Sequence, residues 1–287
     1  MKFLVIGNLT KDIIRTKTEE KVVFGGSSSY CSITAAKLGC EAYVLSRGNH
    51  ELDEWVRELK DHRIGVELQK SQNVTTFVND YTYDPRIQHV LSDAGKIKFT
   101  AKKKMDIIHI GPVFNEINLE CVKEARKNCK LLSLDVQGFL RVVKNKQVVN
   151  KFWDEWRDFL KFVDILKLGE YEISSLSRKK KYEDVYNEVL DVGVKVIELT
   201  LGERGAIIAG EKIYKIPAYR TIIIDPTGCG DVFASAFAIR YFETKDEMES
   251  GLFASAAASF VVEAFGSKNI VGKDKVEKRY NELKVKL

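Results

Sequence analysis

Two glycines and an aspartate near residue 230 make up the part of the sequence best suited to chemistry. Gly228 and Gly230 lack a side chain, so the backbone there can approach a ligand closely, and Asp231 stands at the start of a helix expected over 232–242. The free N–H groups at that helix end would attract an anion such as phosphate. Because phosphoryl transfer to a hydroxyl requires such amides and a carboxylate that takes the proton, we interpret Asp231 as a catalytic base.

A purely structural interpretation of Asp231 is also open. An aspartate at the start of a helix commonly caps the first N–H groups, and a capping residue needs no chemical role. The sequence contains neither the G-x-x-x-x-G-K-[ST] loop nor the G-x-G-x-x-G fingerprint of common nucleotide-binding proteins. A phosphate site at 228–231 would therefore belong to a different class of enzyme.

The elements that must position Asp231 follow an alternating pattern. Short, continuously apolar runs predict strands buried on both faces, and amphipathic stretches between them predict helices. This alternation is typical of βαβ units, so we expect an α/β fold with a mostly parallel sheet in one domain over 1–287. A further apolar run over 222–224 predicts a strand that leads into the glycines. The other expected strands are 3–6, 42–45, 107–110, 131–134, 165–168 and 194–197, and the expected helices are 118–128, 183–191, 232–242, 246–265 and 274–287.

One region interrupts this alternation. The segments 76–82 and 87–91 flank Asp-Pro-Arg at 84–86, which predicts a hairpin. With 21–24 it would form a small sheet that stands off the main domain, its strands drawn from about 11–24 and 74–100. We consider three roles for this sheet: a lid over a site, a contact in a homodimer, and a surface decoration.

The composition is that of a protein of the cytoplasm. In 287 residues, 46 lysines and arginines stand against 41 aspartates and glutamates, and a net charge of +5 from so balanced a set gives no reason to expect nucleic acid as a partner. Five cysteines without a C-x-x-C pair indicate neither a disulfide framework nor a zinc site, which favours a reducing compartment. No apolar run approaches the roughly 18 residues of a membrane span, so we expect no membrane contact.

Several motifs resemble those of one known family. The segment DPTGCGDVFASAF over 225–237 resembles the C-terminal signature of the ribokinase/PfkB family of carbohydrate kinases. GGSSSYCSITAAKLG over 25–39 is similar to its N-terminal double-glycine signature, and TLGERG over 200–205 to its segment beside the nucleotide. These motifs occur in the family's order across nearly the whole chain. The resemblance implies a ribokinase-like three-layer α/β/α domain with a small β-sheet lid.

The resemblance also implies roles for individual residues in ATP-dependent phosphoryl transfer. Asp231 would be the base, and the backbone of Gly228, Cys229 and Gly230 would form the anion hole. Glu172 would act on Mg²⁺ through water, although Gly169 replaces the asparagine of the family's N-x-x-E motif. Asp225 lies where some members bind a monovalent cation such as K⁺. The residues implied beside the nucleotide are Thr200, Gly202, Gly205 and Ser255, the last standing where many members have an asparagine.

For the phosphoryl acceptor the resemblance points to a small molecule with hydroxyl groups. Tyr30 replaces a sugar-binding asparagine, and D-x-Q-x-x-x-R over 135–141 resembles inositol-kinase-like branches, so we expect a sugar or cyclic polyol such as myo-inositol. A nucleoside kinase of the same family and a non-catalytic ligand-binding protein on this fold are the alternatives. Arg141 would contact substrate or phosphate, or else pair with Asp135 at the surface. The residues implied at the acceptor are Asp12, Gly25, Gly26, Tyr30, Gln137 and Arg141.

Overall fold

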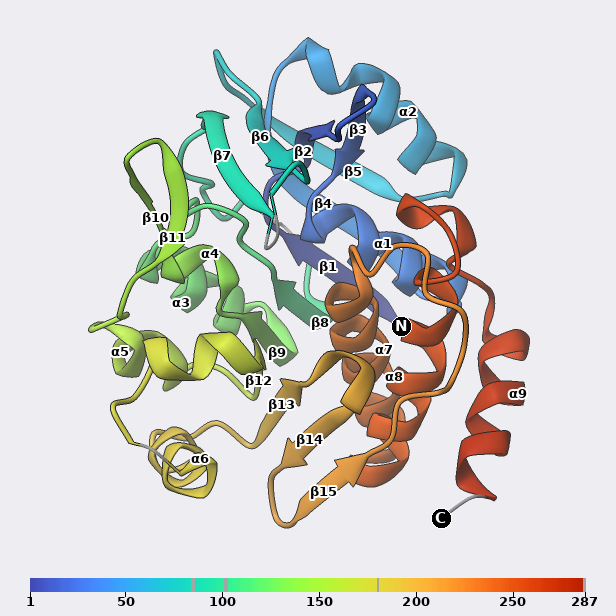
Figure 1. Cartoon of the computed structure of the whole chain (residues 1–287). Coiled ribbons are helices and arrows are strands. Elements are labelled where there is room, and N and C mark those ends of the chain that lie inside the picture. Colours follow the sequence, from blue (N-terminus) through green and yellow to red (C-terminus); the bar gives the residue numbers. More distant parts are fainter. Residues whose placement is uncertain (84–85, 101–102, 180, 286–287) are drawn as a thin grey trace.

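The main sheet is built as the alternating pattern predicts. The computed structural model describes residues 1–83, 86–100, 103–179 and 181–285 (Figure 1). In this part of the chain nine strands form one sheet in the order β15-β14-β13-β12-β9-β8-β1-β4-β5. The strands from β13 to β5 in this order pair in parallel, whereas the pairs β13–β14 and β14–β15 are antiparallel. The strands are β1 (Lys2–Ile6), β4 (Glu41–Gly48), β5 (Gly65–Lys70), β8 (Met105–Ile110), β9 (Cys129–Asp135), β12 (Ile165–Gly169), β13 (Val196–Thr200), β14 (Ala206–Ala209) and β15 (Ile213–Ile216).

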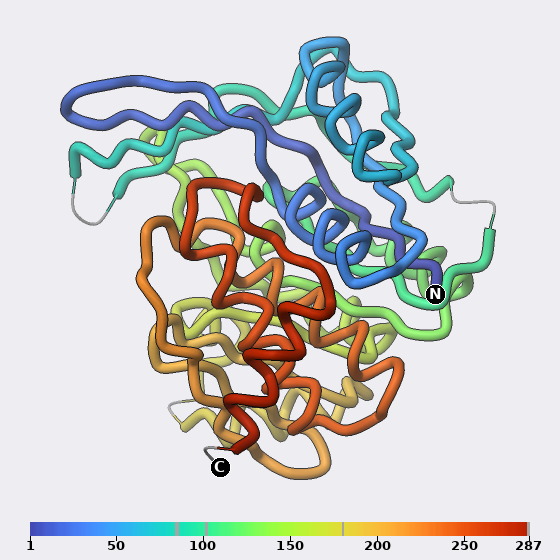
Figure 2. Tube along the Cα trace, turned by 90° about the vertical axis from the view of Figure 1, so that its right-hand side faces the viewer, coloured from blue at the N-terminus to red at the C-terminus, as the bar shows by residue number. Residues whose placement is uncertain are grey.

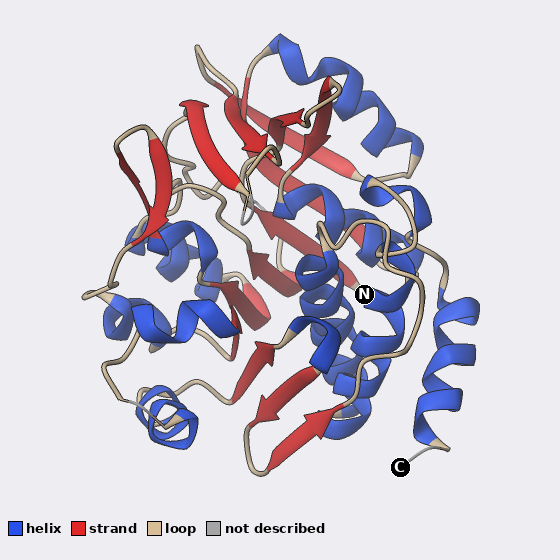
Figure 3. Cartoon of the chain, viewed as in Figure 1, coloured by secondary structure: helices blue, strands red, loops and turns tan. Residues whose placement is uncertain are grey.

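The strands are apolar on both faces because helices cover both sides of the sheet. In β1, Phe3 and Val5 point into one core while Leu4 and Ile6 point into the other. The first core is completed by α1 (Ser27–Lys37), α2 (Asp53–Asp61), α7 (Cys229–Thr244), α8 (Glu247–Val261) and α9 (Lys273–Lys284). The second is completed by α3 (Leu119–Lys127), α4 (Gln137–Leu140), α5 (Trp156–Leu160) and α6 (Tyr182–Leu190), and Figure 3 shows these helices on the opposite side of the strands.

A separate four-stranded sheet stands beside the main domain. Its order is β3-β2-β6-β7, with β2 (Thr10–Arg15), β3 (Glu20–Gly25), β6 (Thr75–Asp80) and β7 (Ile87–Ser92). We call these strands the lid sheet. The expected hairpin and the expected strand at 21–24 are confirmed, whereas the expected turn at 84–86 falls partly outside the described residues. Figure 2 shows both hairpins extending together from one end of the molecule.

The prediction of a strand at 222–224 is wrong. These isoleucines lie in an irregular segment, and their side chains are 45–79% exposed. β2 lies almost wholly within the range of about 11–24 from which lid strands are expected. Strands absent from the sequence-based prediction are β5, the hairpin of β10 (Arg141–Lys144) and β11 (Gln147–Asn150), and the pair β14–β15. Short 3₁₀-helices also occur, of which η2 (Glu170–Ser175), η3 (Gly202–Arg204) and η4 (Gly266–Asn269) lie near segments discussed below, while η1 (His50–Leu52) precedes α2. No helix in the described ranges is long and apolar enough to cross a membrane.

Candidate active site

The first turn of α7 contains the predicted phosphate-binding residues. Gly228 is the N-cap, with φ +78°, and no side chain caps this helix. Asp231 is the third helical residue, so its interpretation as the N-cap is wrong. A Cβ atom on Gly228 would lie 2.2 Å from Cδ1 of Tyr30, so the backbone passes directly over the ring. The Cys229 N–H donates to the carbonyl oxygen of Pro226 at 3.2 Å, so its expected place in the anion hole is wrong, whereas the amides of Gly230 and Asp231 at this helix end are available to an anion.

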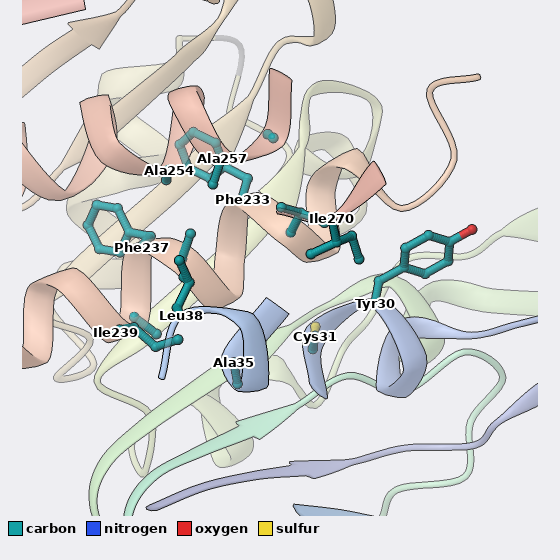
Figure 4. Packing of buried hydrophobic residues seen from close by; sticks show 14 of the residues in the cluster. Tyr30, Cys31, Ala35, Leu38, Phe233, Phe237, Ile239, Ala254, Ala257 and Ile270 are labelled. Carbon is teal, nitrogen blue, oxygen red and sulfur yellow. The ribbon is translucent and has the colours of Figure 1, made fainter. Parts of the chain in front are cut away.

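Tyr30 lies at the edge of the core beside this turn. Figure 4 shows its hydroxyl directed away from the apolar cluster that joins α1 to α7. Burial raises the pKa of the Tyr30 hydroxyl, and the nearby carboxylates of Asp225, Asp231 and Asp12 raise it further. Tyr30 therefore stands among three of the predicted site residues as a neutral phenol.

Beneath the turn, the sheet contributes a row of charged side chains. Lys167 on β12 is in register with Asp135 on β9 and with Glu198 on β13, so all three point to the same face of the sheet. Nζ of Lys167 lies 2.7 Å from Oδ2 of Asp135, and both side chains are less than 10% exposed. A Cβ atom on Gly230 would lie only 3.2 Å from this Nζ, so the ammonium group sits directly below the anion hole.

Asp231 has the electrostatic surroundings of a base that works near neutral pH. Burial raises the pKa of its carboxyl to about 6; Lys167 opposes this shift, and Asp135 adds to it. Ser27 donates a hydrogen bond to the carboxylate, which also lowers its pKa. A carboxyl group with a pKa close to the working pH is well suited to accept a proton from a substrate hydroxyl.

Asp12 lies on β2, in the middle of the lid sheet, and it packs against the double glycine. A Cβ atom on Gly25 would lie 2.9 Å from its Oδ2, and one on Gly26, whose φ is +89°, would lie 2.4 Å from the carbonyl oxygen of Asn8. Burial raises the pKa of Asp12 to about 6, against hydrogen bonding from Thr10 and the charges of Arg141 and Arg86. Oδ1 of Asp12 has no partner within the described structure. Its free oxygen is available to a substrate hydroxyl.

Arg141 and Gln137 flank the acceptor side from the end of β9. Nη1 of Arg141 donates to the carbonyl oxygen of Val113 at 2.9 Å, and the guanidinium group lies 5.5 Å from the centre of the Phe77 ring in the lid sheet. No carboxylate of the described residues forms an ion pair with Arg141, so the alternative of a surface pair with Asp135 is wrong. The backbone N–H of Gln137 donates to Oδ1 of Asp135 at 2.8 Å.

The residues expected beside the nucleotide divide into two groups. Thr200 ends β13 next to Gly169, Gly202 opens η3 with φ +61°, and Gly205 has φ +88° with space for no side chain, since a Cβ atom would lie 2.0 Å from the carbonyl oxygen of Ile216. These three belong to the turn that joins β13 to β14. Ser255 is separate: it is 6% exposed on α8, and its hydroxyl donates to the carbonyl oxygen of Pro217 at 2.6 Å.

The residues expected to bind cations present oxygen atoms suited to them. Oε2 of Glu172 accepts a hydrogen bond from the Gly169 N–H at 2.6 Å, which fixes the carboxylate at the end of β12. Burial raises its pKa, while Lys167 opposes that shift. Asp225 accepts from the N–H groups of Thr227 at 3.0 Å and Gly266 at 3.4 Å, in the segment before α7. Hard oxygen donors of this kind fit Mg²⁺ shared with phosphates, and a monovalent cation, respectively.

Sequence reasoning missed Lys167 and Glu198. Glu198 is fully buried, and neither carboxylate oxygen has a partner in the described structure. Each is a single charged residue inside an otherwise apolar buried strand, in ILKLG and VIELT. Charged residues are rarely fully buried without a partner, so this pattern could have identified both residues from the sequence.

The comparisons with known proteins agree with this geometry. A sequence profile described as pfkB family carbohydrate kinase matches residues 4–273. The chain belongs to this family. A nucleoside kinase of Methanocaldococcus jannaschii is 30% identical over 275 residues, which cover 91% of this chain and 87% of the relative. A nucleoside kinase of Methanothermobacter thermautotrophicus is 26% identical over 269 residues, which cover 89% and 84%. Kinase relatives of this length make the chain a sugar or nucleoside kinase of the pfkB family.

Solved structures confirm the ribokinase-like fold. A pyrophosphate-dependent kinase in the ribokinase family, complexed with a pyrophosphate analog and myo-inositol, superposes with a TM-score of 0.85 over 96% of this chain and 99% of that one. Its sequence is 24% identical to that of the present pfkB family member, so the similarity shows the fold alone. This chain has both sheets that such a fold is expected to contain, the mostly parallel central sheet and the small lid sheet.

Proposed function

We propose that this protein transfers the γ-phosphoryl group of ATP to a hydroxyl of a sugar or cyclic polyol, with Asp231 as the general base. One observation supports this above all: the half-buried Asp231 carboxylate stands in the first turn of α7, which has no side-chain cap, beside the N–H groups of Gly230 and Asp231, which have no acceptor in the described structure. Proton acceptor and anion-binding amides thus come from the same helical turn. Phosphoryl transfer needs both within one substrate's reach.

The reaction assigns each group one task. The acceptor hydroxyl gives its proton to Asp231 as its oxygen bonds to the γ-phosphorus, and the bond between that phosphorus and the β–γ bridging oxygen breaks to release ADP. The amides of Gly228, Gly230 and Asp231 would stabilise the negative charge on the transferred group, whereas the amide of Cys229 donates to the Pro226 carbonyl oxygen. Thr200, Gly202 and Gly205 would hold the nucleotide. Mg²⁺, when bound near Glu172, would neutralise phosphate charge, and K⁺ near Asp225 would support the segment before α7.

We propose a six-membered polyol or hexose-like acceptor because of Tyr30. The phenol fills more volume than the asparagine it replaces, and it offers one hydroxyl in place of an amide's donor and acceptor, while Asp12 can accept from the hydroxyls of the acceptor. Ribose would leave one of these polar groups without a partner, which discriminates strongly between substrates. Arg141 and Gln137 would complete the acceptor site.

A nucleoside acceptor is the second candidate, because aromatic side chains lie in and beside the lid sheet. Phe77 of β6 and Phe114 meet edge to face at 6.3 Å, and Tyr81 follows β6 in the chain. An aromatic slot of this kind can take a base. Two of the relatives described above are named nucleoside kinases.

A substrate panel distinguishes these acceptors. ADP release would be measured with ribose, fructose, 2-keto-3-deoxygluconate, myo-inositol, adenosine and cytidine. We expect the highest kcat/KM for myo-inositol or a hexose-like acceptor, and we expect Tyr30→Asn to narrow its advantage over ribose. A parallel series with pyrophosphate, followed by phosphate release, tests the donor. Ribose as the best acceptor would contradict the role given to Tyr30, and turnover only with pyrophosphate would contradict ATP as donor.

The base is tested by Asp231→Asn. The amide keeps the shape of the carboxylate but cannot accept the proton, so turnover should fall by ~10²–10⁴ while nucleotide affinity changes little. Asp274→Asn is a matched control, because it removes a carboxylate from the first turn of α9, where the side chain is exposed. An Asp231→Asn variant that keeps more than half of the wild-type kcat would overturn the assignment.

A further inference from the structure

Lys167 occupies an unusual position for a lysine. Its side chain is 8% exposed on the central strand β12, and its one ion pair in the described structure is with Asp135. Glu198, in register on the other side, keeps both carboxylate oxygens without a partner. Burial of a lysine lowers the stability of the fold unless its charge has a partner, because removal from water disfavours the ammonium form.

Lys167 nevertheless remains charged. Burial by itself lowers its pKa, but Asp135, Glu172 and Asp231 together outweigh that effect and raise it. Two neighbours contribute little charge: burial holds the pKa of Glu198 well above its usual range, and burial lowers that of His109 to about 4. The groups that face Lys167 or Asp231 are Asp135 on β9, Glu198 on β13, Glu172 on η2, Arg141 on β10, His109 on β8, Tyr30 and Cys31 on α1, and Cys229 on α7.

The position of the ammonium group relative to α7 is specific. A Cβ atom on Gly230 would lie 3.2 Å from Nζ and 3.3 Å from Cε of Lys167, so a side chain at 230 would press on the lysine. A methyl group at 230 would require the lysine or the helix turn to shift by a few tenths of an ångström. Asp231 is the next residue, and Lys167 is the strongest cation acting on it.

We propose that Lys167 is a positioning residue for phosphoryl transfer, supplying from beneath the first turn of α7 the positive charge on which the action of Asp231 as a base depends. This inference rests on the proposed role of Asp231. Asp135 orients Lys167 through their ion pair at 2.7 Å and limits the effect of its charge. Neither residue needs to touch substrate.

Opposite substitutions test this arrangement through the pH dependence of kcat/KM, with ATP and the best acceptor of the panel. Lys167→Met removes the charge but keeps the length, so Asp231 should hold its proton to higher pH. We expect the acidic limb to move up by about one pH unit, which lowers kcat/KM about fivefold at pH 6, where Asp231 is half ionised in the wild type, and hardly at all at pH 9. Asp135→Asn removes the opposing carboxylate, so its acidic limb should move down.

Damage to the fold does not produce shifts of opposite sign. If Lys167→Met leaves Asp135 buried without a partner and fails to fold, Lys167→Met with Asp135→Asn replaces the pair by neutral groups of similar size. Because Lys167 outweighs Asp135 at Asp231, the limb of this double variant should still lie above that of the wild type. Lys167→Arg should restore the wild-type limb.

The outcomes separate this inference from the proposed function. Asp231→Asn with nearly full turnover would remove the base, and the role of Lys167 with it. Loss of turnover in Asp231→Asn, together with acidic limbs that do not move in the lysine and aspartate variants, overturns the inference for Lys167 alone. A uniform loss of rate at every pH in Lys167→Met, with an unmoved limb, shows a merely structural lysine.

Discussion

At the scale of single residues, the site depends on glycines that let other groups come close. Gly228 lets the backbone cross the Tyr30 ring, Gly230 admits the Lys167 ammonium group, and Gly25 makes room for Asp12. The first two contacts join segments that are far apart in the chain, and the third joins the two strands of one hairpin. The positions of the charged groups are therefore set by missing side chains as much as by the charges themselves.

Gly228→Ala should disrupt the site more than strain alone explains. Its φ of +78° costs an alanine about 1–2 kcal/mol, and the added Cβ atom would also overlap the Tyr30 ring at 2.2 Å. We expect a lower Tm and at least a tenfold loss of kcat. Gly39→Ala is the matched control, since φ is +90° there but no atom lies within 4 Å of the added methyl group. Equal losses of Tm and activity in the two variants would show that contact with Tyr30 is unimportant.

In the protein without bound substrate, the Asp12 carboxylate should lower the free energy of unfolding. Its pKa is about 6 in the folded chain and 3.8 in the unfolded one, so the folded state must give up a buried proton as pH rises. The resulting cost is small at pH 4, grows up to about pH 6 and reaches about 2–3 kcal/mol above it.

Asp12→Asn removes that cost, so urea unfolding at pH 7.5 should show a variant more stable than the wild type, with a difference below about 1 kcal/mol at pH 4. Asp274→Asn at an exposed position should change stability equally little at both pH values. A variant less stable than the wild type at pH 7.5 would mean that Asp12 is stabilised by its surroundings.

At the scale of elements, the lid sheet connects the acceptor residues to the rest of the fold. Nδ1 of His89 on β7 lies 2.7 Å from the carbonyl oxygen of Lys146, in the turn between β10 and β11. On the other edge, Nζ of Lys21 on β3 lies 4.6 Å from the centre of the Phe265 ring. The lid sheet thus touches the main domain at both edges, and β10 begins with Arg141.

If these contacts close over substrate, amide exchange in the lid sheet should slow on binding. Hydrogen–deuterium exchange would be measured with the best acceptor, with and without a non-hydrolysable ATP analogue. We expect slower exchange in β2, β3, β6 and β7, and unchanged exchange in α9, which packs on the far helices. Equal exchange in the lid sheet with and without ligand would exclude its role as a lid.

The elements could be predicted where burial decides them. Continuously apolar runs predict the strands β1, β4, β8, β9 and β12, because both faces of these strands are covered by helices. The run at 222–224 has the same appearance but meets no neighbouring strand, and its side chains stay exposed. The range 11–24 is expected to supply lid strands, but β2 reads TKDIIR, and nothing in that mixture of charged and apolar residues predicts that it pairs with both 20–25 and 75–80.

The part of the site that lies within one short segment could be predicted from the sequence. The glycines and Asp231 adjoin one another in the sequence, so their role could be inferred from a short segment. The contact of Lys167 with Asp135 and Gly230 joins three distant segments, and only the register of β9, β12 and β13 brings these residues together. No local pattern contains that register.

At the scale of the whole molecule, the lid sheet leaves apolar side chains on its two outer strands. Val22 on β3 is 53% exposed and Leu91 on β7 is 61% exposed. Both strands stand at an end of the lid sheet's strand order, and exposed apolar side chains in such positions favour contact with another chain. We therefore propose that two copies of the chain associate through their lid sheets.

Lysine substitutions test this association. Sedimentation velocity should show a dimer for the wild type, and Val22→Lys or Leu91→Lys should shift it towards monomer, because a charged residue on an edge strand opposes pairing. Ile213→Lys is the matched control, being 54% exposed on β15, the edge strand of the main sheet. A wild-type monomer at all concentrations, or equal dissociation by Ile213→Lys, would contradict the proposal.

The strand pairing in the lid sheet also has a consequence for how the chain folds. Its central pair, β2 and β6, is parallel, with Thr10 opposite Thr75, and the two strands leave the main sheet after β1 and after β5. Asn8, at the root of β2, donates to the Thr75 hydroxyl at 3.0 Å. Parallel pairing across so long a loop is entropically costly until other contacts have brought the strand ends together. The half of the main sheet that contains β1, β4 and β5 should therefore form first, and the surface that recognises the acceptor should be among the last parts of the enzyme to reach its native structure.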